Sequence, residues 1–189
     1  MDLLLALILG LGLSAACGFR VFLPPLLLGA LSHTGHFHLA HGFEWLGSPI
    51  GLAIFGTAAL LEIAAYFIPA LDNLLDVAAT PAAVAAGTLA TASVLGEMSP
   101  ALRWPLALIA GGGIASLVQL STVAIRGAST LMSGGLTNHA VASAELAGSG
   151  LLSLAAIFVP LLALFLLAGL LIAAPWVLLR LRRRALTRS

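Results

Sequence analysis

The chain has 189 residues, of which 61% are hydrophobic and 8% are charged, and its mean hydropathy is +1.14. Soluble domains carry about 25% charged residues, so this composition excludes an ordinary soluble protein and indicates an integral membrane protein. The net charge of +1 gives no basis for nucleic-acid binding, and the single cysteine, Cys17, excludes an intrachain disulfide.

Apolar segments long enough to cross a bilayer follow one another along the chain. Because a spanning helix needs about 20 apolar residues, they predict one all-α polytopic transmembrane bundle over residues 1–189, with about five spans and six as the alternative. We expect spans at residues 3–31, 49–69, 80–96, 102–125 and 151–179. The last run is long for one span, so it either tilts or breaks at Pro160 or Pro175.

The first segment, 3–31, is longer than the hydrocarbon core and carries an arginine followed by two prolines. Pro24 and Pro25 lack backbone N–H donors, so we expect a kink or break after Arg20. Arg20 either reaches an interface or is buried against a carboxylate. Residues 14–17 resemble a lipoprotein cleavage site, but the only early charge is Asp2, which favours a retained helix.

The second span and the residues after it carry the most unusual polar pattern in the sequence. A carboxylate at mid-membrane depth costs about 2.5–3.5 kcal/mol and is usually buried and functional. At helical spacing one stripe contains Glu62, Tyr66, Pro69 and Asn73, and Asp72 and Asp76 lie one turn apart beside it. We expect Glu62 to face the bundle interior near Arg20 or Arg126.

A histidine-rich loop separates the first two spans. It contains His33, His36, His38 and His41 within residues 32–48. Imidazole suits zinc, copper or nickel, but no cysteine joins the cluster. We therefore expect no metal, no cofactor and a loop that is dispensable for folding.

The middle of the chain combines small and polar residues. The third span has a face of small residues, which lets helices pack closely within a chain or between copies in a homo-oligomer. This face comprises Ala82, Ala83, Ala86, Gly87, Ala90 and Thr91. The fourth span contains a triple glycine, 111–113, then the polar residue Gln119, and it ends near Arg126. A glycine- and hydroxyl-rich segment, 127–138, leads to Asn138 and Glu145.

The charge at the C-terminus predicts the topology. All eight basic residues are arginine, and five lie in the last ten positions, 180–189. By the positive-inside rule this tail is cytoplasmic, so five spans place the N-terminus outside. The chain would then be a multi-pass inner-membrane protein with a cytoplasmic C-terminus.

Two internal matches suggest a duplication. Residues 5–12 match 106–113, and residues 60–69 match 151–160, which divides the chain into halves at about 1–76 and 101–175. With five spans the matched helices would run in opposite directions. Inverted repeats with interrupted helices are a common transporter plan, although a duplicated pair could simply form a stable bundle.

The sequence also resembles a known family. The stretches 13–22, 61–63, 72–76, 79–81, 109–113 and 126–138 are similar to a bacterial membrane family described as domain of unknown function 4126. The resemblance covers nearly the whole chain and implies a small bacterial integral membrane protein. It implies no established activity.

No motif of an enzyme is present: nucleophile–base pairs, Walker loops and HExxH are all missing from the sequence. A buried polar site instead favours a transporter or channel for an ion or an unidentified small molecule. The alternatives are a structural or assembly protein with internally paired charges, or a membrane-embedded enzyme acting on a lipid-like substrate. The candidate substrate-binding residues are Arg20, Glu62, Tyr66, Asp72, Asn73, Asp76, Gln119, Arg126, Asn138 and Glu145.

Overall fold

A computed structural model describes residues 2–66, 69–96, 98–134 and 136–186. Within its helices, the side chains at 66, 69–77, 132–133, 174–175 and 177–186 are outside the description. The elements are α1 (Leu3–Phe19), α2 (Leu23–His33), the 3-10 turn η1 (Glu44–Gly47), α3 (Pro49–Tyr66), α4 (Pro69–Val94), α5 (Pro100–Leu106), the π-helical turn η2 (Ala107–Gly112), α6 (Gly113–Ser133), α7 (Asn138–Phe158) and α8 (Pro160–Leu186). The described residues contain no strand, so the predicted all-α class is confirmed.

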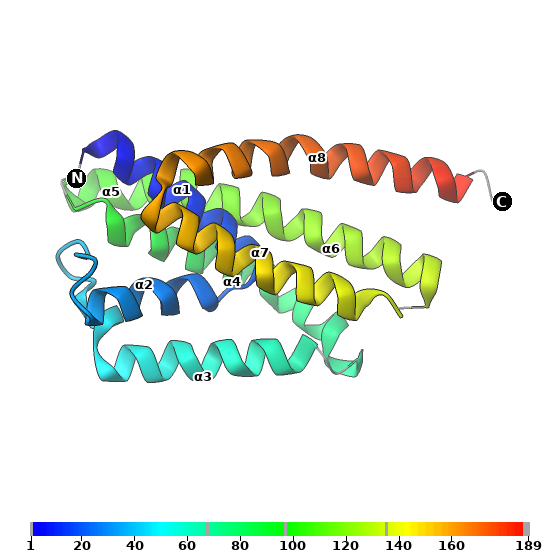
Figure 1. The fold of residues 1–189 in the computed structure, drawn as a ribbon, viewed down its shortest axis with the longest axis horizontal. Helices are drawn as coiled ribbons and strands as arrows, with labels where there is room; N and C mark the ends of the chain where they lie inside the picture. Colours follow the sequence, from blue (N-terminus) through cyan, green and yellow to red (C-terminus); the bar gives the residue numbers. More distant parts are fainter. Residues whose placement is uncertain (1, 67–68, 97, 135, 187–189) are drawn as a thin grey trace.

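The first predicted span is a helical hairpin. Helix α1 ends at Phe19, as the prolines after Arg20 predict, and α2 begins at Leu23. Figure 1 shows α2 running back beside α1, so that residues 3 and 33 lie at the same end of the molecule. The tip of this hairpin, residues 20–22, lies in the interior. We call it the α1–α2 tip.

Small residues let α1, α4 and η2 pack closely together. Ser14 donates to the carbonyl of Gly87 (2.9 Å), and Thr91 donates to the carbonyl of Gly10 (3.1 Å). A Cβ on Gly111 would lie 2.3 Å from Thr91 Oγ1, so only glycine fits at this crossing. The small face predicted for residues 82–91 thus packs within the chain.

The inverted relation between the two halves is wrong for the first matched pair of helices. Gly10 and Gly111 both contact Thr91, and Gly18 contacts Val118. The helices that contain residues 5–12 and 106–113 therefore run in the same direction, as Figure 1 also shows. The physical reason is the α1–α2 tip, because a segment that turns back on itself makes no net crossing.

The second matched pair does run in opposite directions, since α3 and α7 lie antiparallel in Figure 1. The last apolar run, 151–179, breaks at Pro160, one of the two proline positions where a break was expected, because α7 ends at Phe158 and α8 begins at Pro160. Helix α7 begins already at Asn138, and most of the polar segment before it is the C-terminal part of α6. Residues 70–79, which lie between the second and third predicted spans, belong to α4.

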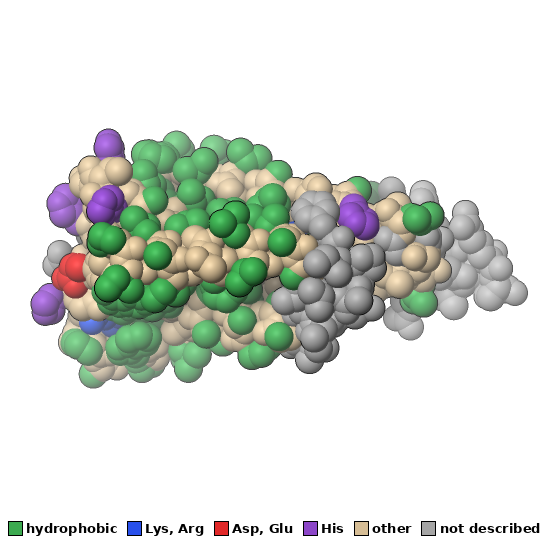
Figure 2. Space-filling model, turned by 90° about the horizontal axis from the view of Figure 1, so that it is seen from below, with side chains coloured by type: hydrophobic (Ala, Val, Ile, Leu, Met, Phe, Trp, Pro, Cys, Tyr) green, Lys and Arg blue, Asp and Glu red, His purple; other side chains and the backbone are tan. Residues whose placement is uncertain are grey.

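Apolar side chains cover the outside of the bundle, while charged ones lie inside. Ile50, Leu131 and Phe165 are among the large hydrophobic side chains that are more than 70% exposed. Figure 2 shows green hydrophobic side chains over much of the described part of one face, with several histidines and an acidic group at one end. Five described charged side chains are buried, namely Arg20, Glu62, Arg103, Arg126 and Glu145.

Two helical stretches, Pro100–Leu131 and Asn138–Phe158, are long and apolar enough to cross a membrane. Shorter apolar helices occur at Leu3–Phe19, Leu23–His33, Pro49–Ala65, Ala78–Val94 and Pro160–Ala173. The composition, the apolar exterior and the buried charges all agree with a membrane protein.

Candidate functional site

The carboxylate of Glu62 lies against the α1–α2 tip. Its Oε1 accepts the backbone N–H of Val21 (2.8 Å) and its Oε2 accepts that of Phe22 (3.1 Å). The side chain is 7% exposed. In the described part of the chain, these two amides are the polar partners of Glu62, and no described cation pairs with it within 4 Å.

The local sequence explains why the tip needs this carboxylate. A helix start leaves its first amide donors without intrahelical partners. Pro24 and Pro25 occupy the first turn of α2 and have no backbone N–H. The N–H groups that still need an acceptor at this helix start are therefore those of the residues before the prolines. Glu62 accepts two of these, and its negative charge is favourable at the positive end of the α2 dipole.

A second buried carboxylate, Glu145, pairs with two arginines. Its Oε1 accepts from Arg126 Nε (3.0 Å), and its Oε2 contacts Arg126 Nη2. Arg20 Nη2 lies 3.5 Å from Glu145 Oε2 and donates to the carbonyl of Ala142 (2.7 Å). Each of the three residues is at most 4% exposed, so this is an ion-pair network inside the bundle.

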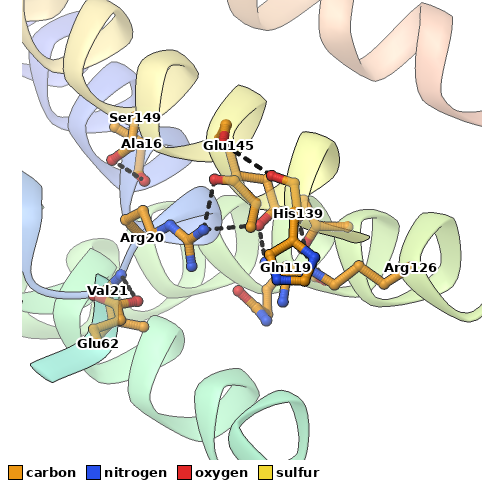
Figure 3. Close-up of polar contacts among 12 residues, drawn as sticks. Ala16, Arg20, Val21, Glu62, Gln119, Arg126, His139, Glu145 and Ser149 are labelled. Carbon is orange, nitrogen blue, oxygen red and sulfur yellow. Dashed lines mark hydrogen bonds and ion pairs between the residues drawn. The ribbon is translucent and has the colours of Figure 1, made fainter. Parts of the chain in front are cut away.

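Arg20 links the two carboxylates, as Figure 3 shows. Its guanidinium reaches Glu145 on α7, while the next residue, Val21, donates its N–H to Glu62 on α3. Arg20 is also the residue that ends α1, where a positive charge is favourable next to the last carbonyls. Two helix ends, two arginines and two carboxylates therefore meet in one buried region, and the formal charges of these four described side chains cancel.

The structure brings together half of the residues predicted for the site. Arg20 is buried against a carboxylate, which settles the alternative left open by the sequence, and Glu62 faces the interior beside the Arg20–Phe22 segment, as predicted. Arg126 and Glu145 pair directly. Gln119, 3% exposed, lies beside this group in Figure 3.

The other predicted residues are not part of the described network. Asn138 lies at the start of α7 and donates to Thr130 Oγ1 (3.1 Å), which connects α6 and α7 near their turn. The side chains of Tyr66, Asp72, Asn73 and Asp76 lie outside the described residues.

Some partners in this region carry no signal in the sequence. The donors of Val21 and Phe22 and the carbonyl of Ala142 are backbone groups, which any residue type supplies. Ser149 was also missed, although it donates to the carbonyl of Ala16 (2.9 Å) one turn before the tip. Its signal was weak, because it is one of three serines in α7 and a serine within a helix usually bonds only to its own helix.

An apolar groove reaches the tip from the side of the bundle. It has a volume of about 650 Å³, and its lining combines residues of the tip with residues of α3, α4, α5 and η2, including Val21, Phe22, Phe55, Leu89, Trp104 and Leu108. The described residues contain no group of three His, Cys, Asp or Glu side chains that could hold a metal ion. The region around the tip is therefore built from ion pairs and backbone donors.

Comparison with known proteins gives a family but no activity. A family model described as a domain of unknown function (DUF4126) matches residues 7–180. Searches of curated proteins and of solved structures give no match.

Proposed function

Because this chain belongs to the DUF4126 family, a domain of unknown function, its activity has to be inferred from its own residues, and we propose that it is a multi-pass membrane protein that moves an ion or a small polar solute across the bilayer. The observation that carries the proposal is Glu62, a buried carboxylate whose described polar partners are two backbone amides at an interrupted helix.

Interrupted helices near the middle of a membrane supply ion and substrate sites, because their free backbone groups and dipoles act at close range. Non-helical backbone at membrane depth is tolerated only where protein covers it or a cavity lies beside it. The α1–α2 tip has this character, since it joins two helix ends inside an apolar bundle. A proton or a cation that binds Glu62 would weaken its hold on the amides of Val21 and Phe22, which couples ion binding to the position of α2.

The ion-pair network of Glu145 supports a different role for its own residues. The carboxylate of Glu145 neutralises two buried arginines at close range. If another cation bound this carboxylate, both arginines would lose the negative charge that they share while still buried, which is costly. We therefore assign Glu145, Arg20 and Arg126 to holding α1, α6 and α7 together, and Glu62 to the transported or coupling ion.

The test is ion flux into liposomes that contain the purified protein. Protons are followed with an internal pH dye while a potassium gradient and valinomycin set the membrane potential, and sodium is followed in parallel as ²²Na⁺. The wild-type protein should carry one of these ions faster than protein-free liposomes. Glu62→Gln should lose this flux, and the matched control Glu44→Gln, in the exposed loop, should keep it.

The opposite result would favour the structural alternative. If correctly folded wild-type protein gives no flux of either ion, or if Glu62→Gln carries as much as wild type, then Glu62 is not an ion site.

A further inference from the structure

We propose that the chain binds an anionic phospholipid, with the lipid phosphate at Arg103 and one acyl chain in the groove between α3, α4, α5 and η2. This inference rests on the proposed membrane location but not on transport. It concerns a different arginine and the end of the molecule that carries the histidine loop.

Arg103 is a buried cation that the described residues leave without a counter-charge. Its side chain is 8% exposed, and its Nε is fully buried with no hydrogen-bond partner. Among the described residues, its guanidinium makes one polar-type contact, a cation–π contact with the ring of Phe43, at 5.2 Å from the ring centre. A buried guanidinium that lacks an acceptor is costly, so a site of this kind favours an external anion.

The groove continues from the surroundings of Arg103. The ring of Phe43 also lies 5.7 Å from that of Trp104, and Trp104 lines the groove. Ala107, one helical turn after Arg103, belongs to the same buried apolar cluster as Phe43 and Phe55. Phe55 also lines the groove, so the cationic site and the groove share one wall.

The lining of the groove is suited to a hydrocarbon chain. Apart from Thr88, the side chains that line it are apolar, and the hydroxyl of Thr88 already donates to the carbonyl of Val84 (2.7 Å). Lipid acyl chains are apolar and thin enough for such a groove, whereas a free phosphate ion would gain nothing from it.

The position of Arg103 matches the depth of a lipid headgroup. It lies in the first turns of α5, at the end of the bundle that also holds the loop with Phe43. Trp45 and Trp104 are both about half exposed at this end, and tryptophan is enriched where a membrane meets water. A guanidinium between helices at this level can form charge-assisted hydrogen bonds with the phosphate of a phospholipid headgroup.

The experiment measures quenching of Trp104 by lipids with brominated acyl chains. A background with Trp45→Phe and Trp176→Phe leaves Trp104 as the only tryptophan of the chain. The protein in mild detergent is titrated with brominated phosphatidylglycerol and, separately, with brominated phosphatidylcholine. We expect phosphatidylglycerol to bind about tenfold more tightly, as one charge-assisted contact implies.

Two variants separate the headgroup from the groove. Arg103→Gln should abolish the preference, so that phosphatidylglycerol and phosphatidylcholine bind with about the same affinity. Arg103→Lys should keep part of the preference. Ala85→Phe should fill the groove, since Ala85 lines it, and should weaken quenching by both lipids. Millimolar inorganic phosphate should not compete.

The proposal is overturned if both lipids quench wild type equally, or if Arg103→Gln keeps the preference. Competition by inorganic phosphate would show a site for free phosphate instead. If Arg103→Gln does not fold, the lipid preference of wild type and the binding of Ala85→Phe still test the proposal. Lipid binding to Ala85→Phe as tight as to wild type would show that the acyl chain does not lie in the groove.

Discussion

Glu62 and Glu145 are both buried carboxylates in an apolar bundle, and the chain stabilises their charges in two different ways. Glu145 lies between two arginines, whereas Glu62 is held by two backbone amides and the end of a helix dipole. An ion pair of this kind resists exchange, because removal of one partner leaves charges buried. A carboxylate held by amides leaves neutral groups behind when it is protonated or moves, so the difference indicates which site can change state.

The largest expected effect comes from Glu145→Gln. This change leaves Arg20 and Arg126 buried without their shared carboxylate, and breaking a buried pair costs about 3–5 kcal/mol. The free energy of unfolding in detergent micelles, from chemical denaturation, measures the loss. The double variant Glu145→Leu with Arg126→Leu should recover part of it, because the pair is then replaced by apolar packing. If Glu145→Gln lowers the free energy of unfolding by less than Glu62→Gln does, Glu62 and not Glu145 has the larger structural role.

The next effect tests whether α1 packing holds the tip in place. A Cβ on Gly18 would lie 2.5 Å from Val118 Cβ and 2.6 Å from the carbonyl oxygen of Ala115. Gly18→Ala should therefore push the tip away from α6 and cost about 1–3 kcal/mol. The matched control is Gly148→Ala on α7, where the nearest atom, on Phe19, is at an ordinary 3.8 Å. Equal stability of the two variants in the same denaturation assay would contradict the close packing.

Glu62→Gln should cost less than either change. The amide oxygen can still accept one N–H of the tip and both arginines keep their contact with Glu145, so about 1–2 kcal/mol of charge-assisted hydrogen bonding is lost. The variant should fold and melt slightly below wild type, and thermal unfolding in micelles measures the shift. A cost as large as that of Glu145→Gln would show that both carboxylates have the same structural role.

The sequence predicted the chemistry of this region better than its topology. The positions of Arg20, Glu62, Arg126 and Glu145 stood out because charges are rare in apolar helices, and all four are buried. The prolines predicted the break after Arg20, but not the direction of the chain beyond it. Direction depends on packing against other helices, which composition and spacing do not encode.

The reversal at the tip accounts for the error about the repeat. A count of apolar segments treats 3–31 as one crossing, and the predicted opposite directions of the first matched pair followed from that count alone. The backbone partners of Glu62 were invisible for a related reason. Amides at a helix end are identical in every residue except proline, so only the fold shows which of them need an acceptor.

The smallest effects are expected in the histidine loop, at the opposite end of α3 from Glu62. His36, His38 and His41 are exposed, and in the described loop His41 pairs with Glu44, which is also exposed. Replacing these three histidines with serine should leave the melting temperature within error of wild type, because exposed ion pairs contribute little.

His33→Ser is the informative contrast, since Nδ1 of His33 is hydrogen-bonded to the carbonyl oxygen of Gly47 (2.8 Å) and joins α2 to η1. It should lower the free energy of unfolding by about 0.5–1.5 kcal/mol. Addition of zinc should not shift the melting temperature of wild type or of either histidine variant. A zinc-dependent rise in the melting temperature of wild type alone would show that the loop binds metal.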